Sequence, residues 1–484
     1  MTKPDFKGNL IAGKWCEALS GKRLSNHSAI DTDIVLHEFP ASAADDVTNA
    51  VDAADQAQKA WAEMPAPARG KILFHAAEIL SARSSEAAEL MTREMGKPIR
   101  EARGEIARSI DLFRYYASWG WRSDGKRFPS ASPETILYTV RAPLGVVSLI
   151  TPWNFPSAIP VWKTAPALIT GNTIVLKPAS LAPASAILAA ECLQQAGLPA
   201  GVLNIICGSG SALSEPLLTD QRIKAVSFTG SSSTGDQVFK LAANPQRRVG
   251  LEMGGKNPIL IMNDAPLDEA VELTITGAMG LAGQKCTATS RAIVHQDIAK
   301  AFTEKLLARV KSLKTADPLE NSTDVGPVVD ENALKTILNY IETGKKDGAN
   351  LAEGGYRLTD EEHKKAFYCA PTVFTDVTAE MTIAREEIFG PVLAVMVARD
   401  CDHAIEIANS TAYGLAAAIC TQDLKIAQKF IDQIQAGLVH INSTTSGAEP
   451  HVPFGGMKQS SSGFREMGES GIDFFSTIKT VYYQ

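Results

Sequence analysis

The chain has 484 residues, of which 45% are hydrophobic and 21% are charged, and its formal net charge is -7 at pH 7. This length exceeds what a single hydrophobic core supports, so we expect two or three domains. The composition excludes a disordered or collagen-like chain, and the scattered basic residues argue against nucleic-acid binding.

Targeting and metal-binding signals are weak in this sequence. The first residues, MTKPDFKGNLIAGKW, lack the charged start and apolar run of a secretory signal. The longest apolar runs, such as LGVVSLI (144–150), fall well short of the 18 or so residues of a membrane span. The seven cysteines are scattered and contain no C-x-x-C pair, which argues against a disulfide framework and a zinc site. We therefore expect a cytoplasmic protein without a membrane span or a metal.

The N-terminal quarter predicts helices. Residues 42–61 carry a candidate capping box, Ser42 with Asp45. Apolar side chains then recur at the spacing of one helix face, at Val47, Val51, Ala54 and Trp61. A second helical stretch is predicted over about 68–117. Residues 122–143 break this pattern with charge, Gly and Pro before an alternating ILYTV segment, which predicts a connector with an exposed hairpin.

From residue 145 onward, apolar strand-like runs alternate with helical stretches. The first series contains GVVSLIT (145–151), NTIVLKP (172–178), VLNIIC (202–207) and KAVSFTG (224–230). The second contains ILIM after Pro258, AIVH (292–295), a helix over 298–313 and LVHIN (438–442). Runs of Val, Ile and Leu without strict alternation are typical of strands buried on both faces. The pattern therefore predicts an α/β protein with two doubly wound, Rossmann-like domains.

The end of the chain, FFSTIKTVYY (474–483), is rich in β-forming residues. An unpaired terminal strand exposes backbone groups that another strand can bind. We therefore expect this segment to pair with another subunit, as part of a small β element for oligomerisation.

Neither glycine-rich segment matches a complete nucleotide-binding fingerprint. GSGSALSEP (208–216) lacks the third glycine of a dinucleotide motif, and FTGSSSTG (228–235) lacks the lysine of a P-loop. The second segment nevertheless closes a predicted strand and opens a predicted helix. Free backbone N–H groups and hydroxyls at such a helix start suit a phosphate, although an ordinary turn is the alternative.

Two further segments present polar side chains beside prolines or glycines. TPWNFP (151–156) holds the amide of Asn154 on a stiff apolar loop, as an oxyanion site requires. In LEMGGKNP (251–258), partial desolvation of Glu252 would raise its pKa toward that of a general base. The alternatives are a turn asparagine and a solvated loop glutamate.

Cys286 lies in GQKCTATSR (283–291), among small and polar neighbours that suit an accessible thiol. The alternative is a small core cysteine whose reactivity is never used, as is typical of cysteines. The nearest histidine, His295, is nine residues on, and His440 and His451 stay open as partners of a cysteine–histidine pair. Without such a partner, reactivity requires a thiolate favoured by nearby N–H groups or a cation.

Seven motifs follow one another in the chain: TPWNFP, VLKPAS, FTGS, LEMGGKNP, GQKCTATSR, EEIFGP (386–391) and PFGGMKQSSSG (453–463). Over essentially its whole length the sequence resembles the NAD(P)-dependent aldehyde dehydrogenases, which carry these motifs in this order. The resemblance implies a cofactor-binding domain (1–121 and 140–251), a catalytic domain (252–445), and bridging or oligomerisation segments (122–139 and 446–484).

The resemblance also implies a mechanism. Cys286 thiolate attacks the aldehyde carbon, and the Asn154 amide and the Cys286 backbone N–H hold the oxyanion. The thiohemiacetal gives hydride to the nicotinamide. Glu252 then activates water to hydrolyse the thioester, and it is a candidate base for the thiol.

For the cofactor, the resemblance places Trp153 and Lys177 on the adenosine side, Gly230 and Ser231 at the pyrophosphate, Met253 at the nicotinamide end, and Glu387 with Phe389 at the nicotinamide ribose. NAD-preferring members often carry an acidic residue three positions after the lysine, where this chain has Ser180. Ser180 leaves room and charge for a 2'-phosphate, so we expect NADP to be accepted as well as NAD.

The substrate is a small aldehyde. Segments 159–168, 283–291 and 449–469 resemble the α-ketoglutaric (2,5-dioxopentanoate) semialdehyde dehydrogenases more than the succinate-semialdehyde branch. In that branch an arginine stands where this chain has Trp162, before Lys163. Lys163 and Arg291 are candidate partners of a substrate carboxylate, with structural ion pairs as the alternative. Succinate semialdehyde, or a broad range of aliphatic and aromatic aldehydes, is the alternative substrate class.

Two other functions are compatible with the resemblance. A crystallin-like structural protein would not need Cys286, Glu252 and Asn154 together. A dehydrogenase that passes the acyl group to coenzyme A typically lacks the glutamate. We expect a homodimer or a homotetramer, and the sequence does not distinguish these two oligomeric states.

Overall fold

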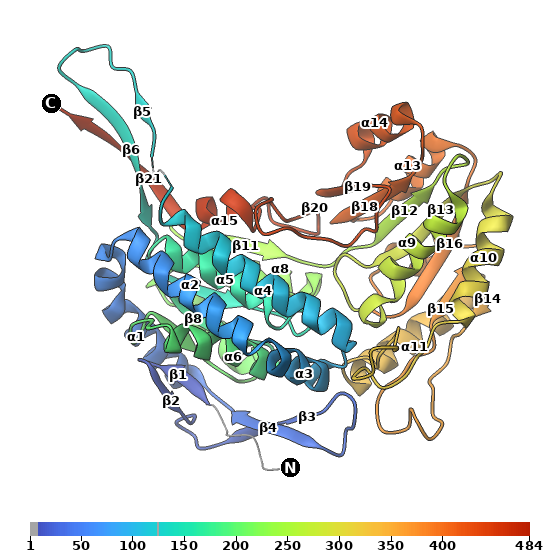
Figure 1. Cartoon of the computed structure of the whole chain (residues 1–484), viewed down its shortest axis with the longest axis horizontal. Coiled ribbons are helices and arrows are strands. Elements are labelled where there is room, and N and C mark those ends of the chain that lie inside the picture. The colour runs from blue at the N-terminus through green and yellow to red at the C-terminus, as the bar shows by residue number, and fades with distance from the viewer. Residues whose placement is uncertain (1–7, 123–124) are drawn as a thin grey trace.

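The computed structural model describes residues 8–122 and 125–484. Two seven-stranded sheets form the centres of two lobes, and a narrow β arm projects from one of them (Figure 1). The predicted α/β class with two doubly wound domains is confirmed. The domain boundaries given above stay predictions, and residues 1–7 and 123–124 of those ranges lie outside the described residues.

The first sheet has the strand order β11-β10-β7-β8-β9-β1-β2. Its strands are β11 (Arg248–Glu252), β10 (Ile223–Thr229), β7 (Val146–Ile150), β8 (Thr173–Lys177), β9 (Leu203–Ile205), β1 (Asn9–Ile11) and β2 (Lys14–Cys16). The first five run parallel, and β1 is antiparallel to β9. The order reverses between β7 and β10, and crevices that bind ligands in α/β proteins lie at the carboxyl ends of such neighbouring strands.

Helices cover both faces of this sheet. One face packs against α1 (Ala44–Glu63), α7 (Gly210–Thr219) and α8 (Ser232–Ala242). The other packs against α5 (Ala158–Ile169), α6 (Pro183–Gln195), α2 (Ala66–Ala82) and α4 (Ile99–Trp119), with α3 (Ser84–Met95) beside them. The predicted helical stretch over 68–117 is thus three helices, with breaks at Arg83 and at residues 96–98. At the second break Gly96 adopts a left-handed conformation and Pro98 follows it.

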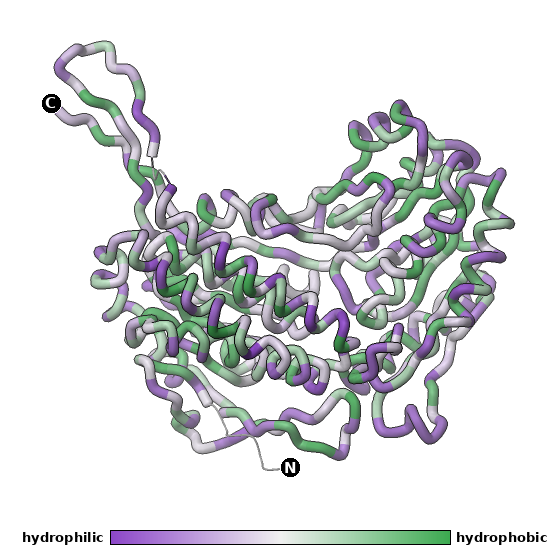
Figure 2. Tube along the Cα trace, in the orientation of Figure 1, coloured by the Kyte–Doolittle hydropathy of each residue, from purple (hydrophilic) through white to green (hydrophobic). Residues whose placement is uncertain are grey.

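The second sheet has the order β14-β15-β16-β13-β12-β18-β19. Its strands are β14 (Asn350–Glu353), β15 (Thr372–Thr375), β16 (Val392–Ala398), β13 (Thr289–His295), β12 (Asn257–Ile261), β18 (Ala416–Cys420) and β19 (Leu438–Ile441). All pairs are parallel except β14 with β15. Its helices are α9 (Leu267–Met279), α10 (Ala299–Lys311), α11 (Glu331–Lys346), α12 (Thr382–Arg385), α13 (Cys401–Asn409) and α14 (Leu424–Gln433). The hydrophobic stretches of the chain follow the strands, while surface loops are largely hydrophilic (Figure 2).

Short elements complete the fold. Two small sheets pair β3 (Arg23–His27) with β4 (Val35–Pro40), and β17 (Tyr413–Gly414) with β20 (Met457–Lys458). A helical turn, η1 (Gly280–Gly283), precedes the candidate cysteine, and α15 (Gly468–Phe474) precedes the last strand. Among the described helices, none combines the length and apolar character that crossing a bilayer requires.

The predicted capping box at the start of α1 is wrong by one residue. The cap position is Ala43, whose N–H donates to Asp46 Oδ2 at 2.9 Å. Ser42 Oγ instead exchanges hydrogen bonds with the Asn9 side chain, at 2.8 and 3.1 Å. This tertiary contact with β1 takes the hydroxyl away from the helix, and Asp45 stays exposed.

The arm consists of β5 (Arg127–Phe128), β6 (Ile136–Pro143) and the last strand β21 (Ser476–Tyr483). The exposed hairpin predicted here is present as β5 and β6. β21 pairs with β6 over its eight residues, so the terminal strand is not unpaired as the sequence suggested. Its other edge carries no partner strand from the described part of the chain, so pairing with another subunit stays a prediction.

Asn172 joins three segments at the base of the first sheet. Its Oδ1 accepts hydrogen bonds from the N–H groups of Leu144 and Gly145, at 2.8 and 3.0 Å. Its Nδ2 donates to the carbonyl oxygens of Ala167 and Phe475, at 3.2 and 2.8 Å. The side chain is fully buried, so water cannot replace these partners.

We predict that Asn172→Ala destabilises the protein by roughly 3 kcal/mol or more, because several buried backbone groups lose their partners. The apparent melting temperature at a fixed scan rate should fall by at least about 5 °C. Asn321→Ala is the control, because exposed Asn321 makes a surface hydrogen bond with Arg103. Equal melting temperatures for the two variants would show that Asn172 does not carry this junction.

Candidate active site

Cys286 lines a cavity of about 350 Å³ between the two lobes. Aromatic side chains of Phe155, Trp162 and Phe454 form part of its wall. The cavity therefore places a half-buried cysteine in a largely apolar, concave space, which is the environment that small-molecule sites share.

The loop that carries Cys286 is held in one conformation. Gly283 has φ of +69°, and a Cβ there would lie 2.1 Å from the Gly390 carbonyl oxygen, so a side chain at this turn is excluded. On the other side, Asn257 Nδ2 donates to the carbonyl oxygens of Cys286 and Ala288, at 2.8 and 2.9 Å. These contacts fix the direction of the thiol.

Burial raises the pKa of the Cys286 thiol to about 12, with the carboxylates of Glu387 and Glu252 as further causes. The N–H groups of Thr287 and Cys286 act in the opposite direction but do not outweigh burial. That a thiolate is favoured by nearby N–H groups or a cation stays a prediction, and in this arrangement the two N–H groups by themselves do not offset burial. Among the described residues, neither His440 nor His451 hydrogen-bonds to the sulfur, so the cysteine–histidine pair is not formed.

Asn154 follows β7 and is buried beside the cysteine loop. Its Nδ2 donates to the Gln284 carbonyl oxygen at 3.0 Å, two residues before Cys286. An amide group carries a second hydrogen, which stays available for an oxyanion. Gln284 is itself fixed, because its Oε1 accepts from the Val329 N–H at 3.0 Å.

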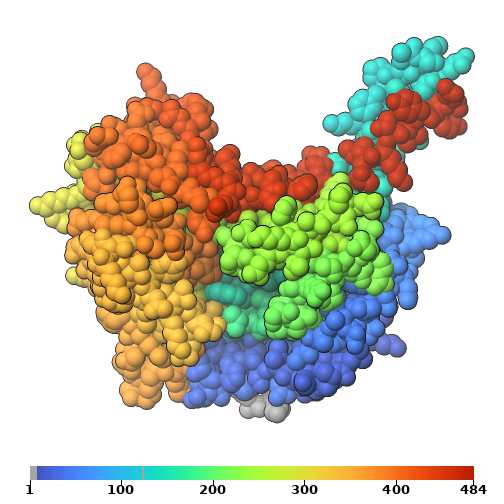
Figure 3. Space-filling model, turned by 180° about the vertical axis from the view of Figure 1, so that it is seen from behind, coloured from blue at the N-terminus to red at the C-terminus, as the bar shows by residue number. Residues whose placement is uncertain are grey.

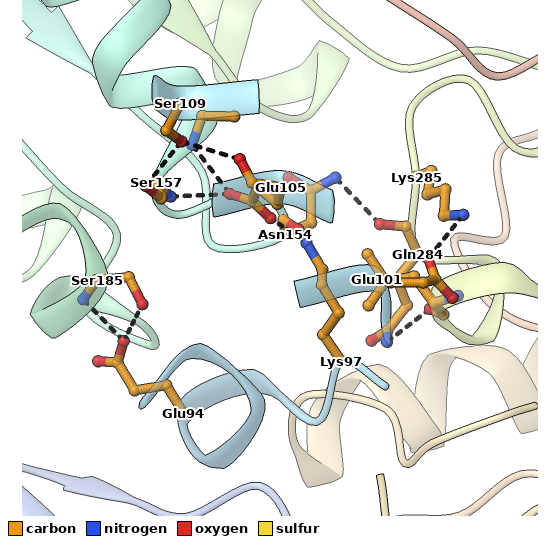
Figure 4. A network of polar contacts seen from close by, with 12 residues as sticks. Glu94, Lys97, Glu101, Glu105, Ser109, Asn154, Ser157, Ser185, Gln284 and Lys285 are labelled. Atoms are coloured by element: carbon orange, nitrogen blue, oxygen red, sulfur yellow. Dashed lines mark hydrogen bonds and ion pairs between the residues drawn. The ribbon is translucent and has the colours of Figure 1, made fainter. Parts of the chain in front are cut away.

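A buried polar network on α4 holds this loop (Figure 4). Lys97 forms an ion pair with Glu105 and donates to the Asn154 carbonyl oxygen at 2.9 Å. Glu105 Oε1 also accepts from the N–H groups of Ser157 and Ala158, both at 2.9 Å, at the start of α5. The carboxylate thereby satisfies two helix N–H groups that have no partner within the helix.

The same helix contacts the cysteine loop. Glu101 pairs with Lys285 at 3.0 Å, and its Oε1 accepts from the Leu281 N–H at 2.8 Å. Helix α4 therefore positions both the Asn154 side and the Cys286 side of the site. Sequence reasoning missed Lys97, Glu101 and Glu105. The spacing of Glu101 and Glu105 with Gly104 and Arg108 places these four on one face of α4, and Lys97 precedes the helix.

Glu252 ends β11 and is only 3% exposed, so the solvated-loop alternative does not apply. Its Oε2 accepts from Ser461 Oγ at 2.7 Å. Burial, followed by the charge of Glu466, raises the pKa of Glu252 well above its usual value. A carboxyl group with a raised pKa can accept a proton near neutral pH, as a general base must.

Of the three candidate substrate residues, only Trp162 lines the cavity. Lys163 is buried and bonded to Glu466 and, at 2.7 Å, to Ser227 Oγ. Arg291 is buried and donates to the carbonyl oxygens of Lys256, Ile407 and Ala408 at 2.8 to 3.0 Å. The expectation that Lys163 or Arg291 binds a substrate carboxylate is therefore corrected, since both are engaged in structural contacts away from the cavity.

Arg108 is the cation that sequence reasoning missed. It lies on α4 and lines the catalytic cavity together with an adjoining cavity of about 460 Å³. Arg108 follows Glu101 by seven residues, a spacing that places both on one face of a helix, and this pattern in the sequence could have indicated Arg108.

All the candidate cofactor residues except Glu387 and Phe389 lie at or follow the carboxyl ends of strands in the first sheet, whereas those two precede β16 of the second. Lys177 ends β8, is buried, and donates to the Pro178 carbonyl oxygen at 3.2 Å. Ser180 is exposed, and its hydroxyl donates to the Gly208 carbonyl oxygen at 2.8 Å. Among the described residues, no acidic side chain pairs with Lys177. Figure 3 shows the hollow between the two lobes on this side of the molecule.

Gly230 and Ser231 lie directly before α8. Ser231 Oγ accepts from the Thr234 N–H at 3.3 Å and so caps the helix. The hydroxyls of Thr229 and Ser232 are buried and have no partner among the described residues. Unpaired donors at a helix N-terminus fit a diphosphate group.

The remaining cofactor candidates lie between α8 and the cysteine. Met253 packs against Gly235, where a Cβ would lie 2.3 Å from its sulfur. Trp153 contacts Phe389 edge to face, with ring centroids 5.6 Å apart. Glu387 accepts from the Gly255 N–H at 3.1 Å, and burial raises the pKa of this carboxyl to about 7. Met253 therefore contacts α8, and Glu387 contacts the loop that follows Met253.

Comparisons with known proteins agree with this geometry. The model of the family described as "Aldehyde dehydrogenase family" matches residues 15–481. The chain is 45% identical to the α-ketoglutaric semialdehyde dehydrogenase of Bacillus subtilis, covering 98% of this chain and 97% of that protein. It is 43% identical to the α-ketoglutarate semialdehyde dehydrogenase of Haloferax volcanii, covering 100% and 99%.

Solved structures give the same result. An NAD-dependent aldehyde dehydrogenase from Sinorhizobium meliloti superposes with a TM-score of 0.96 at 37% identity, covering 100% of this chain and 95% of that one. A betaine aldehyde dehydrogenase from Staphylococcus aureus in complex with NAD+ gives 0.96 at 33% identity, covering 98% and 94%. The chain belongs to the aldehyde dehydrogenase family.

Proposed function

We propose that this aldehyde dehydrogenase oxidises α-ketoglutaric semialdehyde to 2-oxoglutarate with a nicotinamide cofactor. The observation that carries the proposal is Cys286 on a cavity between the lobes, with the buried Asn154 amide bonded to the cysteine loop and the buried Glu252 carboxylate acting on the thiol by its charge. The full-length relatives of this chain bear the proposed substrate in their names. Retention of Glu252 in a buried position supports hydrolysis to the free acid rather than a crystallin-like role or transfer to coenzyme A.

The first step forms a bond between Cys286 sulfur and the aldehyde carbon. Because the pKa of the thiol is raised to about 12, a base must take its proton. Two buried carboxylates, Glu387 and Glu252, act on the thiol by their charge, and we assign the role of the base to Glu252. The negative charge that develops on the aldehyde oxygen is held by the free hydrogen of the Asn154 amide and by the Cys286 N–H.

The second half of the reaction releases the acid. The nicotinamide, when bound, supplies the acceptor for the hydride that leaves the former aldehyde carbon, and a thioester remains on Cys286. Glu252 takes a proton from water, the resulting hydroxide bonds to the thioester carbon, and the carbon–sulfur bond breaks to return the thiolate. Aldehyde, water and oxidised cofactor thus give carboxylate, reduced cofactor and protons.

The cofactor residues support use of both NAD and NADP. Lys177 carries a charge with no acidic partner among the described residues. Three residues on, Ser180 has a hydroxyl group where NAD-preferring members often have a carboxylate. A 2'-phosphate placed there would meet one cation and no anion. NADP acceptance follows from this charge balance.

The arm supports an oligomer, either a homodimer or a homotetramer. The outer edge of β21 offers unpaired backbone groups, and Ile478, Tyr482 and Tyr483 are exposed on this strand. Another copy of the chain would cover these apolar side chains. A cytoplasmic location stays a prediction from the sequence.

The test of substrate and cofactor is kcat/KM for 2,5-dioxopentanoate, succinate semialdehyde, pentanal and benzaldehyde, each with NAD+ and NADP+. We expect 2,5-dioxopentanoate to exceed each other aldehyde by about tenfold or more, which corresponds to ~1.4 kcal/mol. We also expect NADP+ to reach at least about one tenth of the NAD+ value. A higher value for succinate semialdehyde or for an uncharged aldehyde would replace the proposed substrate, and a larger NAD+ advantage would remove the NADP proposal.

The raised pKa of Cys286 predicts a pH dependence of alkylation in the cofactor-free protein. Only the thiolate reacts with iodoacetamide, so the rate constant should rise about tenfold per pH unit from pH 7 to pH 10 without a plateau. Cys286→Ser measures the background from the six other cysteines. A plateau reached by pH 8 would show that the thiol is already ionised and needs no base.

A further inference from the structure

The charged side chains that line the catalytic cavity are paired, with one exception. Lys97 is paired with Glu105, and Lys285 is paired with Glu101. Arg108 makes no hydrogen bond or ion pair with any other described residue. The charges of the two lysines and the two glutamates cancel, so the lining carries one uncompensated positive charge, on the guanidinium group of Arg108.

The position of Arg108 on α4 directs this charge toward the cavity. Glu101, Gly104, Glu105 and Arg108 all line it, and their spacing of i, i+3, i+4 and i+7 defines one helix face. A Cβ at Gly104 would meet no atom within 4 Å. The glycine therefore leaves open space one turn before Arg108, where a larger side chain would occupy the cavity.

Arg108 also lies where two cavities meet. The catalytic cavity and the adjoining one of about 460 Å³ share Arg108, Phe454 and the segment 446–448. That segment, Ser446-Gly447-Ala448, has small side chains and leaves the junction open. A ligand that reaches Cys286 through the adjoining cavity therefore passes the guanidinium group.

We propose that Arg108 binds the carboxylate at the far end of a semialdehyde whose aldehyde carbon lies at Cys286. The inference rests on the proposed function and names the residue that selects its substrate class. Planar guanidinium groups bind carboxylates through two parallel hydrogen bonds, and the adjacent 2-oxo oxygen of an α-keto acid adds another acceptor. The aromatic walls formed by Phe155, Trp162 and Phe454 contact the carbon chain between the two ends.

The other cations of the site are less suited to this role. Lys97 and Lys285 would each have to leave a carboxylate partner to bind a substrate carboxylate. The exchange of one carboxylate for another adds little binding free energy. Lys163 and Arg291 do not reach the cavity. Arg108 is the cation for which binding a substrate carboxylate replaces water rather than an existing ion pair.

The test compares Arg108→Gln with Arg103→Gln. Arg103 lies on the same helix but is exposed, and it donates to Asn321 at 2.7 Å, outside both cavities. Steady-state kinetics are measured with 2,5-dioxopentanoate and with pentanal, which has the same carbon number and no charge. For Arg108→Gln we expect KM for 2,5-dioxopentanoate to rise about 10- to 100-fold, while kcat/KM for pentanal changes less than about threefold. Arg103→Gln should match the wild type with both aldehydes.

Product inhibition gives a second readout that does not depend on turnover of the semialdehyde. With pentanal as substrate, the inhibition constant of 2-oxoglutarate should rise about tenfold or more in Arg108→Gln, while that of pentanoate, which has no second carboxylate, rises less. Arg108→Lys should recover part of the 2-oxoglutarate affinity, because the charge is kept and the paired hydrogen bonds are not.

Two results would overturn the proposal. Equal losses with 2,5-dioxopentanoate and pentanal would show that Arg108 supports the fold of the site and does not bind the carboxylate. Unchanged kinetics with 2,5-dioxopentanoate would show that no contact is made. A failure of the proposed function can be told apart from a failure of the Arg108 proposal, because the wild-type kinetics are enough to reveal it: the wild type would then prefer pentanal to 2,5-dioxopentanoate.

Discussion

The ion pair between Lys97 and Glu105 holds the site together, because both charges are buried and each also fixes a backbone segment. Lys97 holds the Asn154 carbonyl, and Glu105 holds the first N–H groups of α5. Removing one partner of such a pair typically costs 3–5 kcal/mol, since the other charge is left buried without compensation. The pair therefore confines the Asn154 loop to one position, and with it the amide that faces Cys286.

The burial that makes the Lys97–Glu105 ion pair rigid also determines the protonation of Cys286 and Glu252. The pKa of Cys286 and the pKa of Glu252 are both raised, mainly by desolvation. The thiol then keeps its proton until a base takes it, and the raised pKa of the Glu252 carboxyl makes that group a stronger base than an ordinary glutamate. Rigid loops, a protonated nucleophile and a basic carboxylate are thus consequences of one water-poor environment.

Local sequence patterns predicted the strands, the two doubly wound domains and the motifs around Cys286, because these depend on neighbours in the chain. Contacts between distant segments were not predictable from such patterns. Ser42 looks like a helix cap but bonds Asn9, and β21 finds its partner β6 more than 300 residues away. The helical spacing from Glu101 that places Arg108 on the wall of a cavity is also the spacing of side chains that pack into a core. Only the tertiary structure shows which of these environments Arg108 has.

The central claim, that Glu105 acts through Asn154, is tested most directly by a double-mutant cycle on kcat with Glu105→Gln, Asn154→Ala and the double variant. Asn154→Ala should lower kcat roughly 10²- to 10³-fold, as loss of one oxyanion donor does, and Glu105→Gln should lower it by about tenfold or more through misplacement of that donor. The account predicts that the double variant is no slower than Asn154→Ala, within about threefold. Losses that multiply in the double variant would contradict it, because Glu105 would then act independently of the oxyanion amide.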